Sequence, residues 1–361
     1  MNLVNSMIKK RQAVVFKKNK LFFIDQRVLP FQKKLFTASN YKQAIQAIDE
    51  MVIRGAPSIG LAAAYGFALG VNSLNEKNFV KKISLIEKDF ISSRPTAHDL
   101  FNSVKRIKRV SVKAFNEKGI NGARESAVIE AKKINSESSK ASDLIGLHGS
   151  KLIKKNLTVM THCNAGWLAF PEKGSATAPI YTARKKGIKF DVLVSETRPR
   201  NQGSRLTAFE MSQAKIPFKI IVDSASAFLM QRKEVDLVIT GADRIALNGD
   251  TANKIGTLSK ALAAKEYGIP FYIAAPLSTF DFSIATGKQI PIEERNSEEV
   301  TSIKSIQNNK VKLLPTSPRN SKAINYAFDI TPAKFIKGII TEKGIIRASK
   351  GSIKKLMKFV D

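Results

Sequence analysis

Apolar side chains follow two different patterns along the chain, and the first pattern covers roughly residues 1–150. This part shows no regular alternation of strands and helices, but several stretches carry apolar residues at helical spacing. The expected helices span residues 39–53, 59–70, 99–110 and 123–155, the last broken by Gly146 and Gly149. Residues 14–28 read as one or two short strands with a turn at 17–20. The pattern predicts a mostly helical N-terminal domain with a small β-sheet over residues 1–150.

From residue 157 onward, short runs rich in β-branched residues alternate with helical stretches. The runs cover residues 157–161, 190–194, 218–222, 235–240 and 271–275, and the helices 176–186, 206–213 and 254–267. This alternation is typical of parallel strands that are buried on both faces. It predicts an α/β fold in which residues 151–361 form a Rossmann-like domain with a doubly wound parallel sheet. Ligands of such sheets lie beyond the carboxyl ends of the strands, so functional residues are expected directly after each run.

The first strand end carries the single cysteine of the chain, Cys163, followed by Gly166. A buried structural cysteine is common, but a strand end before a glycine turn favours a functional thiol. The second strand end, residues 195–205, carries three arginines, whose forked donors suit phosphate. A solvated basic loop is the alternative interpretation of this turn.

A carboxylate follows the fourth run, where Asp243 comes two residues after Gly241. Asp243 is a candidate general acid or base, although it could instead cap a helix or pair with Arg244. Asn253 and Lys254, at the start of the helix expected there, are candidate phosphate ligands. Neither a Walker loop nor a dinucleotide-binding glycine motif is present.

The N-terminal half adds two arginines at turns before helices. Arg54 precedes Gly55 and Ala56 on a turn that opens an apolar helix, and Arg94 precedes a second helix. Such turns are plausible anion clamps. Phosphate-binding candidates, one thiol and one carboxylate, without a metal or cofactor motif, predict acid–base rearrangement of a phosphorylated metabolite.

The net charge of +30 raises the question of a nucleic-acid partner, because 60 Lys and Arg stand against 30 Asp and Glu. The basic residues are spread along the whole chain, and aromatic residues are not interleaved with them. We therefore expect no specific nucleic acid, and a diffuse field that attracts phosphorylated substrates.

Other composition features limit the cellular setting. One cysteine excludes an intramolecular disulfide and fits a reducing compartment, and the three histidines show no metal-ligand spacing. No apolar stretch reaches the roughly 18–20 residues of a membrane span. The first 20 residues are basic without a secretory pattern, which favours a basic strand or hairpin. We expect a cytoplasmic protein without membrane contact, metal or cofactor.

Long motifs make the chain resemble the methylthioribose-1-phosphate isomerase family of methionine salvage. They are residues 51–60, 94–97, 161–166, 196–199 with Gln202 and Gly203, 241–246, 253–257, 291–295 and 327–332. The resemblance implies a helical N-terminal domain, a Rossmann-like C-terminal domain and a homodimer. It implies that Cys163 and Asp243 are the catalytic pair, with Asp243 as proton donor and Cys163 as acid–base partner. It also implies a site for a sugar 1-phosphate made of Arg54, Gly55, Ala56, Arg94, Gln202, Asn253 and Lys254.

Relatives of this family set the alternatives. Ribose-1,5-bisphosphate and 5-deoxyribose-1-phosphate isomerases share the pattern, and so do the non-catalytic regulatory subunits of translation initiation factor 2B. Retention of Cys163 and Asp243 favours the catalytic branch. The sequence departs from the family pattern at Ser195, where Asp is usual, and at Trp167, where Ala is commoner. Both are near the site in sequence, and the C5 substituent of the sugar stays open.

Overall fold

The computed structural model describes residues 2–94 and 98–359, which fall into two compact units. The first unit comprises Met1–Arg27, Gln32–Ala141 and Trp167–Glu172, and the second comprises Val28–Phe31, Ser142–Gly166 and Lys173–Asp361. Whether residues 1–150 and 151–361 fold as separate domains stays a prediction. Within the described residues, every helix is too short or too polar to span a lipid bilayer.

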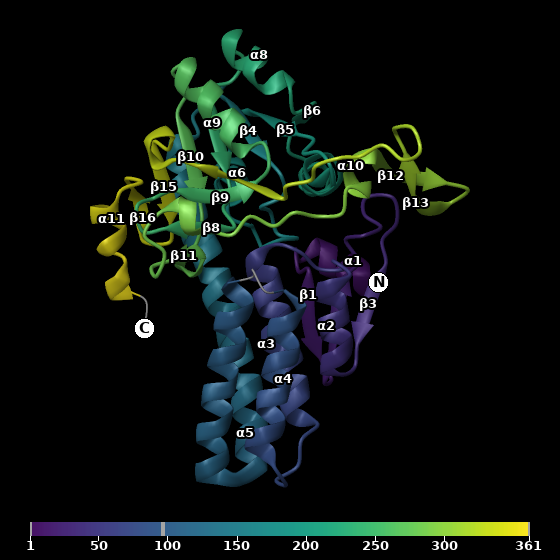
Figure 1. Cartoon of the computed structure of the whole chain (residues 1–361). Coiled ribbons are helices and arrows are strands. Elements are labelled where there is room, and N and C mark those ends of the chain that lie inside the picture. The colour runs from purple at the N-terminus through teal and green to yellow at the C-terminus, as the bar shows by residue number, and fades with distance from the viewer. Residues whose placement is uncertain (1, 95–97, 360–361) are drawn as a thin grey trace. The chain divides into compact units, whose positions relative to one another are not determined.

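The first unit combines a small antiparallel sheet with a group of helices (Figure 1). Its strands follow one another as β1 (Val14–Lys17), β2 (Lys20–Ile24) and β3 (Leu35–Ala38). Its helices are α1 (Leu3–Lys9), α2 (Tyr41–Asp49), α3 (Ala56–Asn72), α4 (Phe79–Ser93) and most of α5 (His98–Gly149). The hairpin of β1 and β2 was predicted, whereas α1, β3 and α4 were not.

The label α5 covers two helices, as predicted, which meet at Gly119, where φ is 66° and the backbone is not helical. The predicted break at Gly146 is wrong, because the second helix continues through it to Gly149. Arg106 on the first half bonds Glu130 and Glu137 on the second. The role of Gly146 is close packing. A side chain at this position would lie 2.5 Å from the hydroxyl oxygen of Thr182 on α6 (Ala178–Lys185).

The core of the second unit is a seven-stranded sheet of order β16-β15-β10-β7-β4-β5-β6. Its strands are β4 (Thr158–His162), β5 (Asp191–Ser195), β6 (Phe218–Ile221), β7 (Leu237–Thr240), β10 (Phe271–Ala274), β15 (Gly338–Thr341) and β16 (Gly344–Ile346). All neighbouring pairs are parallel except β15 and β16. The predicted α/β class with a doubly wound sheet is confirmed.

The strand order reverses beside β4. The chain runs outward from β4 through β5 to β6, then returns to β7 on the other side of β4 and continues to β10. Ligands of open α/β sheets bind at such a reversal, outside the carboxyl ends of the strands. The turns after β4 and β7 therefore flank the place where a ligand is expected.

Smaller elements complete the second unit. The connecting helices besides α6 are α7 (Ala208–Gln213), α8 (Ala225–Gln231), α9 (Thr257–Glu266), α10 (Glu298–Thr301) and α11 (Lys350–Lys354). A four-stranded sheet has the order β11-β8-β9-β14, with β8 (Arg244–Ala246), β9 (Thr251–Lys254), β11 (Phe280–Asp281) and β14 (Phe328–Thr331). A separate hairpin joins β12 (Ser302–Gln307) to β13 (Lys310–Pro315). Helix α8, labelled at the top of Figure 1, packs against α9.

Candidate functional site

Cys163 lies on the turn that follows β4, in the left-handed region with φ of 61°. Its N–H donates to Thr197 Oγ1 at 2.8 Å, and its carbonyl accepts from Thr207 Oγ1 at 2.7 Å. A non-glycine residue in this conformation is strained and persists only where its surroundings hold it. Two threonine hydroxyls therefore fix the backbone that carries the half-buried thiol.

A buried carboxylate lies beneath the same turn. Glu210 on α7 accepts hydrogen bonds from Asn164 Nδ2 at 2.8 Å and from the Tyr181 hydroxyl at 3.1 Å. A side chain at Gly166 would collide with this carboxylate, so a glycine is required there. Polar side chains thus support the turn after β4, together with a backbone bond from the N–H of Ser175 to the carbonyl of Ala165 at 2.8 Å.

Asp243 lies on the turn after β7, directly before β8. Its N–H donates to the carbonyl of Ala252 at 2.9 Å, which ties the turn to the four-stranded sheet. At Gly241 a side chain would lie 2.7 Å from the Cβ of Ala165, so the turns after β4 and β7 are in contact. The structure therefore brings the two sequence-predicted catalytic residues onto neighbouring turns.

Charged side chains lie near Asp243. Arg244 pairs with Asp281, with Nη1 and Oδ2 3.4 Å apart. Arg295 donates two hydrogen bonds to Glu293, from Nε to Oε1 at 2.9 Å and from Nη2 to Oε2 at 3.0 Å. Burial would lower the pKa of the Arg295 guanidinium, but Glu293 and other carboxylates, Asp243 among them, outweigh burial and raise that pKa. Arg295 is therefore a cation that acts on Asp243.

Asn253 and Lys254 lie at the end of β9, not at a helix start as the sequence predicted. Helix α9 begins at Thr257, because the residues before it are paired with β14. Asn253 Nδ2 donates to Thr257 Oγ1 at 2.9 Å, and Lys254 Nζ donates to the carbonyl of Ala327 at 2.8 Å. Asn253 and Lys254 are both buried. They lie near Asp243 along the chain, and the N–H of Asp243 bonds the carbonyl of Ala252, the residue before Asn253 in β9.

Gln202 is buried on the turn after β5. Its Oε1 is buried and accepts no hydrogen bond from any residue that the structure describes. An unsatisfied buried acceptor typically costs about 1–3 kcal/mol. A bound molecule with a hydroxyl group would relieve that cost.

The three arginines of this turn bind other parts of the second unit. Arg198 donates to the carbonyl of Val300 at 2.8 Å and also reaches that of Ser302. Arg200 bonds Glu299 at 2.6 Å, and Arg205 bonds the carbonyl of Leu29 at 2.6 Å. These arginines hold the fold together, which neither the phosphate nor the solvated-loop interpretation anticipated.

In the first unit, Arg54, Gly55 and Ala56 lead into α3. Gly55 has φ of 86°, and a side chain there would lie 2.4 Å from Ala169 Cβ, so only glycine fits. The carbonyl of Ala169 accepts the N–H of Ser58 in the first turn of the helix. The N-terminus of α3 is a favourable environment for an anion.

Arg94 directly follows α4, also in the first unit. Burial raises the pKa of Asp49, whereas the positive charge of Arg94 lowers it, so the two side chains interact electrostatically. Residues 95–97 of the same motif lie outside the described residues.

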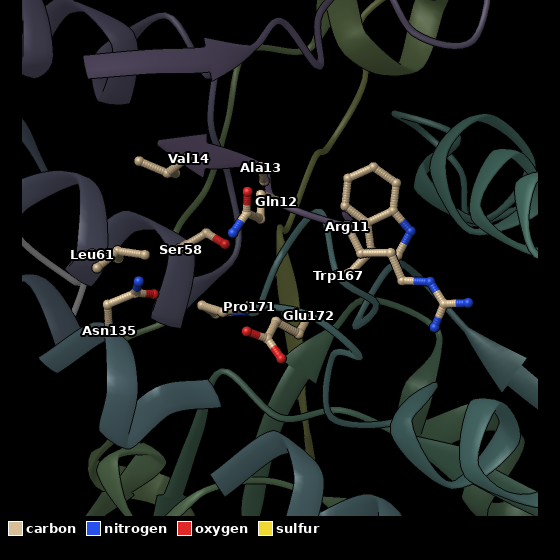
Figure 2. A pocket seen from close by; sticks show the side chains of 10 residues that line it. All are labelled: Arg11, Gln12, Ala13, Val14, Ser58, Leu61, Asn135, Trp167, Pro171 and Glu172. Atoms are coloured by element: carbon tan, nitrogen blue, oxygen red, sulfur yellow. The ribbon is translucent and has the colours of Figure 1, made fainter. Parts of the chain in front are cut away.

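A small pocket in the first unit contains none of the predicted site residues. Figure 2 shows its lining, which comes from the segment before β1, from α3 and α5, and from the segment after the Cys163 turn. Its residues are Arg11, Gln12, Ala13, Val14, Ser58, Leu61, Asn135, Trp167, Pro171 and Glu172. The lining mixes polar and apolar groups, and sequence reasoning gave no sign of it.

Sequence reasoning also missed a group of ionisable residues behind the Cys163 turn, of which His162 and Lys260 are buried. Asp223 lies two residues after the end of β6, so the expectation of functional residues at strand ends would have found it. Lys260 lies on α9, where a lysine reads as solvent-exposed, yet only 1% of it is exposed. His162 ends β4, and burial lowers its pKa to about 3, with Lys260 acting in the same direction.

Comparison with known proteins places the chain in a family. The model of the initiation factor 2 subunit family matches residues 52–348. A methylthioribose-1-phosphate isomerase from Caldicellulosiruptor saccharolyticus is 47% identical, over 92% of this chain and 94% of that protein.

Two solved structures are similar over nearly the full length. The 5-methylthioribose 1-phosphate isomerase from Pyrococcus horikoshii OT3 has a TM-score of 0.87 at 36% identity, covering 99% of this chain and 100% of that chain. The translation initiation factor eIF-2B subunit delta from A. fulgidus has a TM-score of 0.82 at 34% identity, covering 96% and 99%. The fold, the family model and these identities over most of the chain agree. The chain belongs to the methylthioribose-1-phosphate isomerase branch of the initiation factor 2 subunit family, and it is an isomerase.

Proposed function

We propose that this chain converts 5-methylthioribose 1-phosphate into 5-methylthioribulose 1-phosphate, a step of methionine salvage. The observation that carries the proposal is the contact between the turns after β4 and β7, where Ala165 approaches Gly241. Those turns carry a thiol and a carboxylate at the reversal of the strand order, which is where such folds bind ligands. The isomerases that are similar over more than nine tenths of the chain support the same reaction.

The chemistry needs one acid and one acid–base partner. A phosphate on C1 prevents the ring from opening as a free sugar would. In our proposal Asp243 donates a proton to the ring oxygen while the bond from that oxygen to C1 breaks. Cys163 removes the proton from C2 and returns it to C1 through an enediol-type intermediate, or assists a hydride shift between these carbons. The C2 hydroxyl proton then restores Asp243, so the protons balance.

The substrate phosphate and hydroxyls require donors, acceptors and positive charge. We assign this role to Arg54, Gly55, Ala56 and Arg94 of the first unit and to Gln202, Asn253 and Lys254 of the second. Three observations support the assignment. Gly55 opens the N-terminus of α3. Gln202 has a buried acceptor without a donor among the described residues. The Lys254 ammonium is buried within 4.2 Å of the centre of the Phe328 ring.

The test is a substrate panel with the purified chain. Turnover of 5-methylthioribose 1-phosphate should exceed that of ribose 1,5-bisphosphate and 5-deoxyribose 1-phosphate in kcat/KM. A preference for either of the other sugars would reassign the substrate. The similarity to an eIF-2B subunit keeps a regulatory binding role as the second candidate. No turnover of any sugar, together with stable binding to a larger complex, would favour that role.

We further propose that the chain is a homodimer. The edge strand β6 and the helix after it expose apolar side chains, with Ile220, Val222 and Phe228 each about half exposed. An exposed edge strand with apolar side chains favours pairing with another surface. Light scattering after size-exclusion chromatography should give twice the chain mass of 39.8 kDa.

A further inference from the structure

An ion pair between a buried lysine and a partly exposed aspartate lies behind the Cys163 turn, between the segment after β6 and helix α9. Lys260 Nζ is 3.6 Å from Asp223 Oδ1. The ammonium is buried, and no described residue accepts a hydrogen bond from it. Since a lysine has three donors, a fully buried one without acceptors is unusual. Lys260 therefore acts on Asp223 chiefly through its charge.

Asp223 in turn holds the segment after β5. Its Oδ1 accepts from the Ser195 hydroxyl and, at 3.0 Å, from the N–H of Thr197. Its Oδ2 accepts from the N–H of Arg198 at 2.6 Å. Three donors on one carboxyl group favour its ionised form, which accepts hydrogen bonds at both oxygens. Burial raises the pKa of Asp223, but the bond from Ser195 and the charge of Lys260 outweigh it and lower that pKa.

The segment that Asp223 holds is the one that fixes the thiol. Thr197 has φ of 69°, and its hydroxyl oxygen receives the N–H of Cys163. Two consecutive supports, Asp223 on Thr197 and Thr197 on Cys163, therefore keep two left-handed residues in place. Strained backbone of this kind is maintained only by surroundings that leave it no alternative.

We propose that Asp223 and Lys260 are positioning residues for Cys163. Lys260 keeps Asp223 ionised, Asp223 holds residues 195–198, and Thr197 sets the backbone of the thiol. Neither residue touches the reacting atoms. The consequence for catalysis rests on the proposed function, whereas the consequence for the thiol's surroundings does not.

Other ionisable groups face this pair from each neighbouring element. His162 at the end of β4 has Nδ1 3.8 Å from Asp223 Oδ1, and its Nε2 donates to the carbonyl of Ile255 at 2.9 Å. The ring is neutral, because burial lowers its pKa to about 3. Burial lowers the pKa of Lys260, and Asp223, Asp329 on β14 and Glu196 after β5 oppose that shift. Lys254 on β9 lowers the pKa of His162. Of the cations among them, only Lys260 forms a described ion pair with Asp223.

The single cysteine gives a readout that needs no substrate. Iodoacetamide alkylates Cys163 alone in this chain, and its rate reports how well the turn is held. Four variants of the full chain separate the possibilities: Asp223→Asn, Lys260→Met, the double variant, and Lys265→Met. The last removes an exposed charge at the end of the same helix and is the matched control.

In the double variant we expect stability to recover while the alkylation rate and kcat stay altered. Asp223→Asn leaves the buried Lys260 charge without its partner, and Lys260→Met leaves the partly exposed Asp223 without its partner. Each should lower the urea midpoint, Asp223→Asn more, and the double variant should recover much of that loss. Alkylation of Cys163 should remain about threefold or more faster than in the wild type, because the released turn opens locally. The kcat should stay about 10²-fold reduced with little change in KM, since misplaced catalytic groups are costly. Lys265→Met should match the wild type throughout.

Two results would overturn the proposal. One is a double variant that regains wild-type alkylation and kcat together with stability, because the pair would then be structural only. If Asp223→Asn does not fold, Lys260→Met decides alone. Its alkylation rate should exceed those of the wild type and of Lys265→Met, because Asp223 without its cation holds residues 195–198 less firmly. An alkylation rate equal to that of the wild type is the second result. If the wild type turned over none of the sugars, the proposed function would be wrong. The alkylation rates would still show whether Asp223 and Lys260 position Cys163.

Discussion

The turns after β4 and β7 carry the proposed catalytic pair but are held in different ways. Cys163 depends on side chains, since its N–H and carbonyl both bond threonine hydroxyls. Asp243 depends on backbone, since its N–H bonds the carbonyl of Ala252 in an adjoining sheet. A backbone ladder survives most substitutions, whereas a side-chain support is lost with one hydroxyl.

The difference indicates where the site is vulnerable. Behind Cys163 lie His162, Asp223 and Lys260, whose charge states depend on pH and on one another. The turn of Asp243 instead continues directly into β8. Charge acts on both sides of the site, since Arg295 acts on Asp243. We therefore expect the two sides to differ in their dependence on buried hydroxyls, which is stronger on the thiol side.

The largest effect on kcat should come from replacing the reacting groups themselves, and it should be similar for the two turns. Cys163→Ser and Asp243→Asn should each lower kcat by about 10²–10⁴-fold, the usual contribution of a placed acid or base. Both should keep the wild-type circular dichroism spectrum and urea midpoint, since neither change disturbs the backbone bonds of its turn. Near-normal turnover in either purified variant would remove that residue from the proposed mechanism.

A smaller effect should follow from removing one hydroxyl under the thiol. Thr197→Val keeps the size of the side chain but leaves the N–H of Cys163 without its acceptor. The free energy of unfolding should fall by about 1–3 kcal/mol, the cost of an unsatisfied buried polar group. Urea titration monitored by fluorescence measures it.

Thr182→Val is the matched control for this change. The Thr182 hydroxyl is also buried, but it has no hydrogen-bond partner among the described residues. Its loss should leave stability unchanged or raise it slightly. Equal destabilisation by the two valines would mean that the bond to Cys163 contributes nothing specific.

The sequence predicted the parallel sheet well because buried parallel strands are continuous apolar runs. The same rule located Cys163 and Asp243 at strand ends, and the structure brings their turns together. It failed for Lys254, because the polar pair at the end of β9 resembles a helix start more than a strand. The short strands of the four-stranded sheet carry too few residues for a periodic signal.

Lys260 could not be predicted, for a physical reason. A lysine on an amphipathic helix is normally solvated, and only the three-dimensional approach of Asp223 to α9 gives it a partner. Asp223 was detectable as a residue that follows a strand. Its significance depends on three donors from residues 195–198, which no spacing in the sequence reveals.

The smallest effect, and the sharpest test of the difference between the two turns, concerns acid stability. His162 stays neutral in the native state because burial lowers its pKa to about 3, whereas in the unfolded chain its pKa is near the ordinary histidine value of 6.5. Below about pH 6.5 the unfolded state therefore binds a proton that the native state does not. The stability that this residue contributes is present above pH 6.5 and is lost as the pH falls, at up to about 1.4 kcal/mol per pH unit.

His162→Gln should flatten that loss. The glutamine amide can still donate toward the carbonyl of Ile255, but it does not titrate. The difference in unfolding free energy between about pH 7.5 and pH 5 should shrink relative to the wild type, measured by urea titration at both values. His98→Gln, at the start of α5 in the first unit, should leave the difference unchanged. If both variants kept the wild-type dependence, the native ring would be taking up the proton. In that case burial would not keep the native His162 ring neutral, and the thiol side of the site would not have the acid sensitivity expected here.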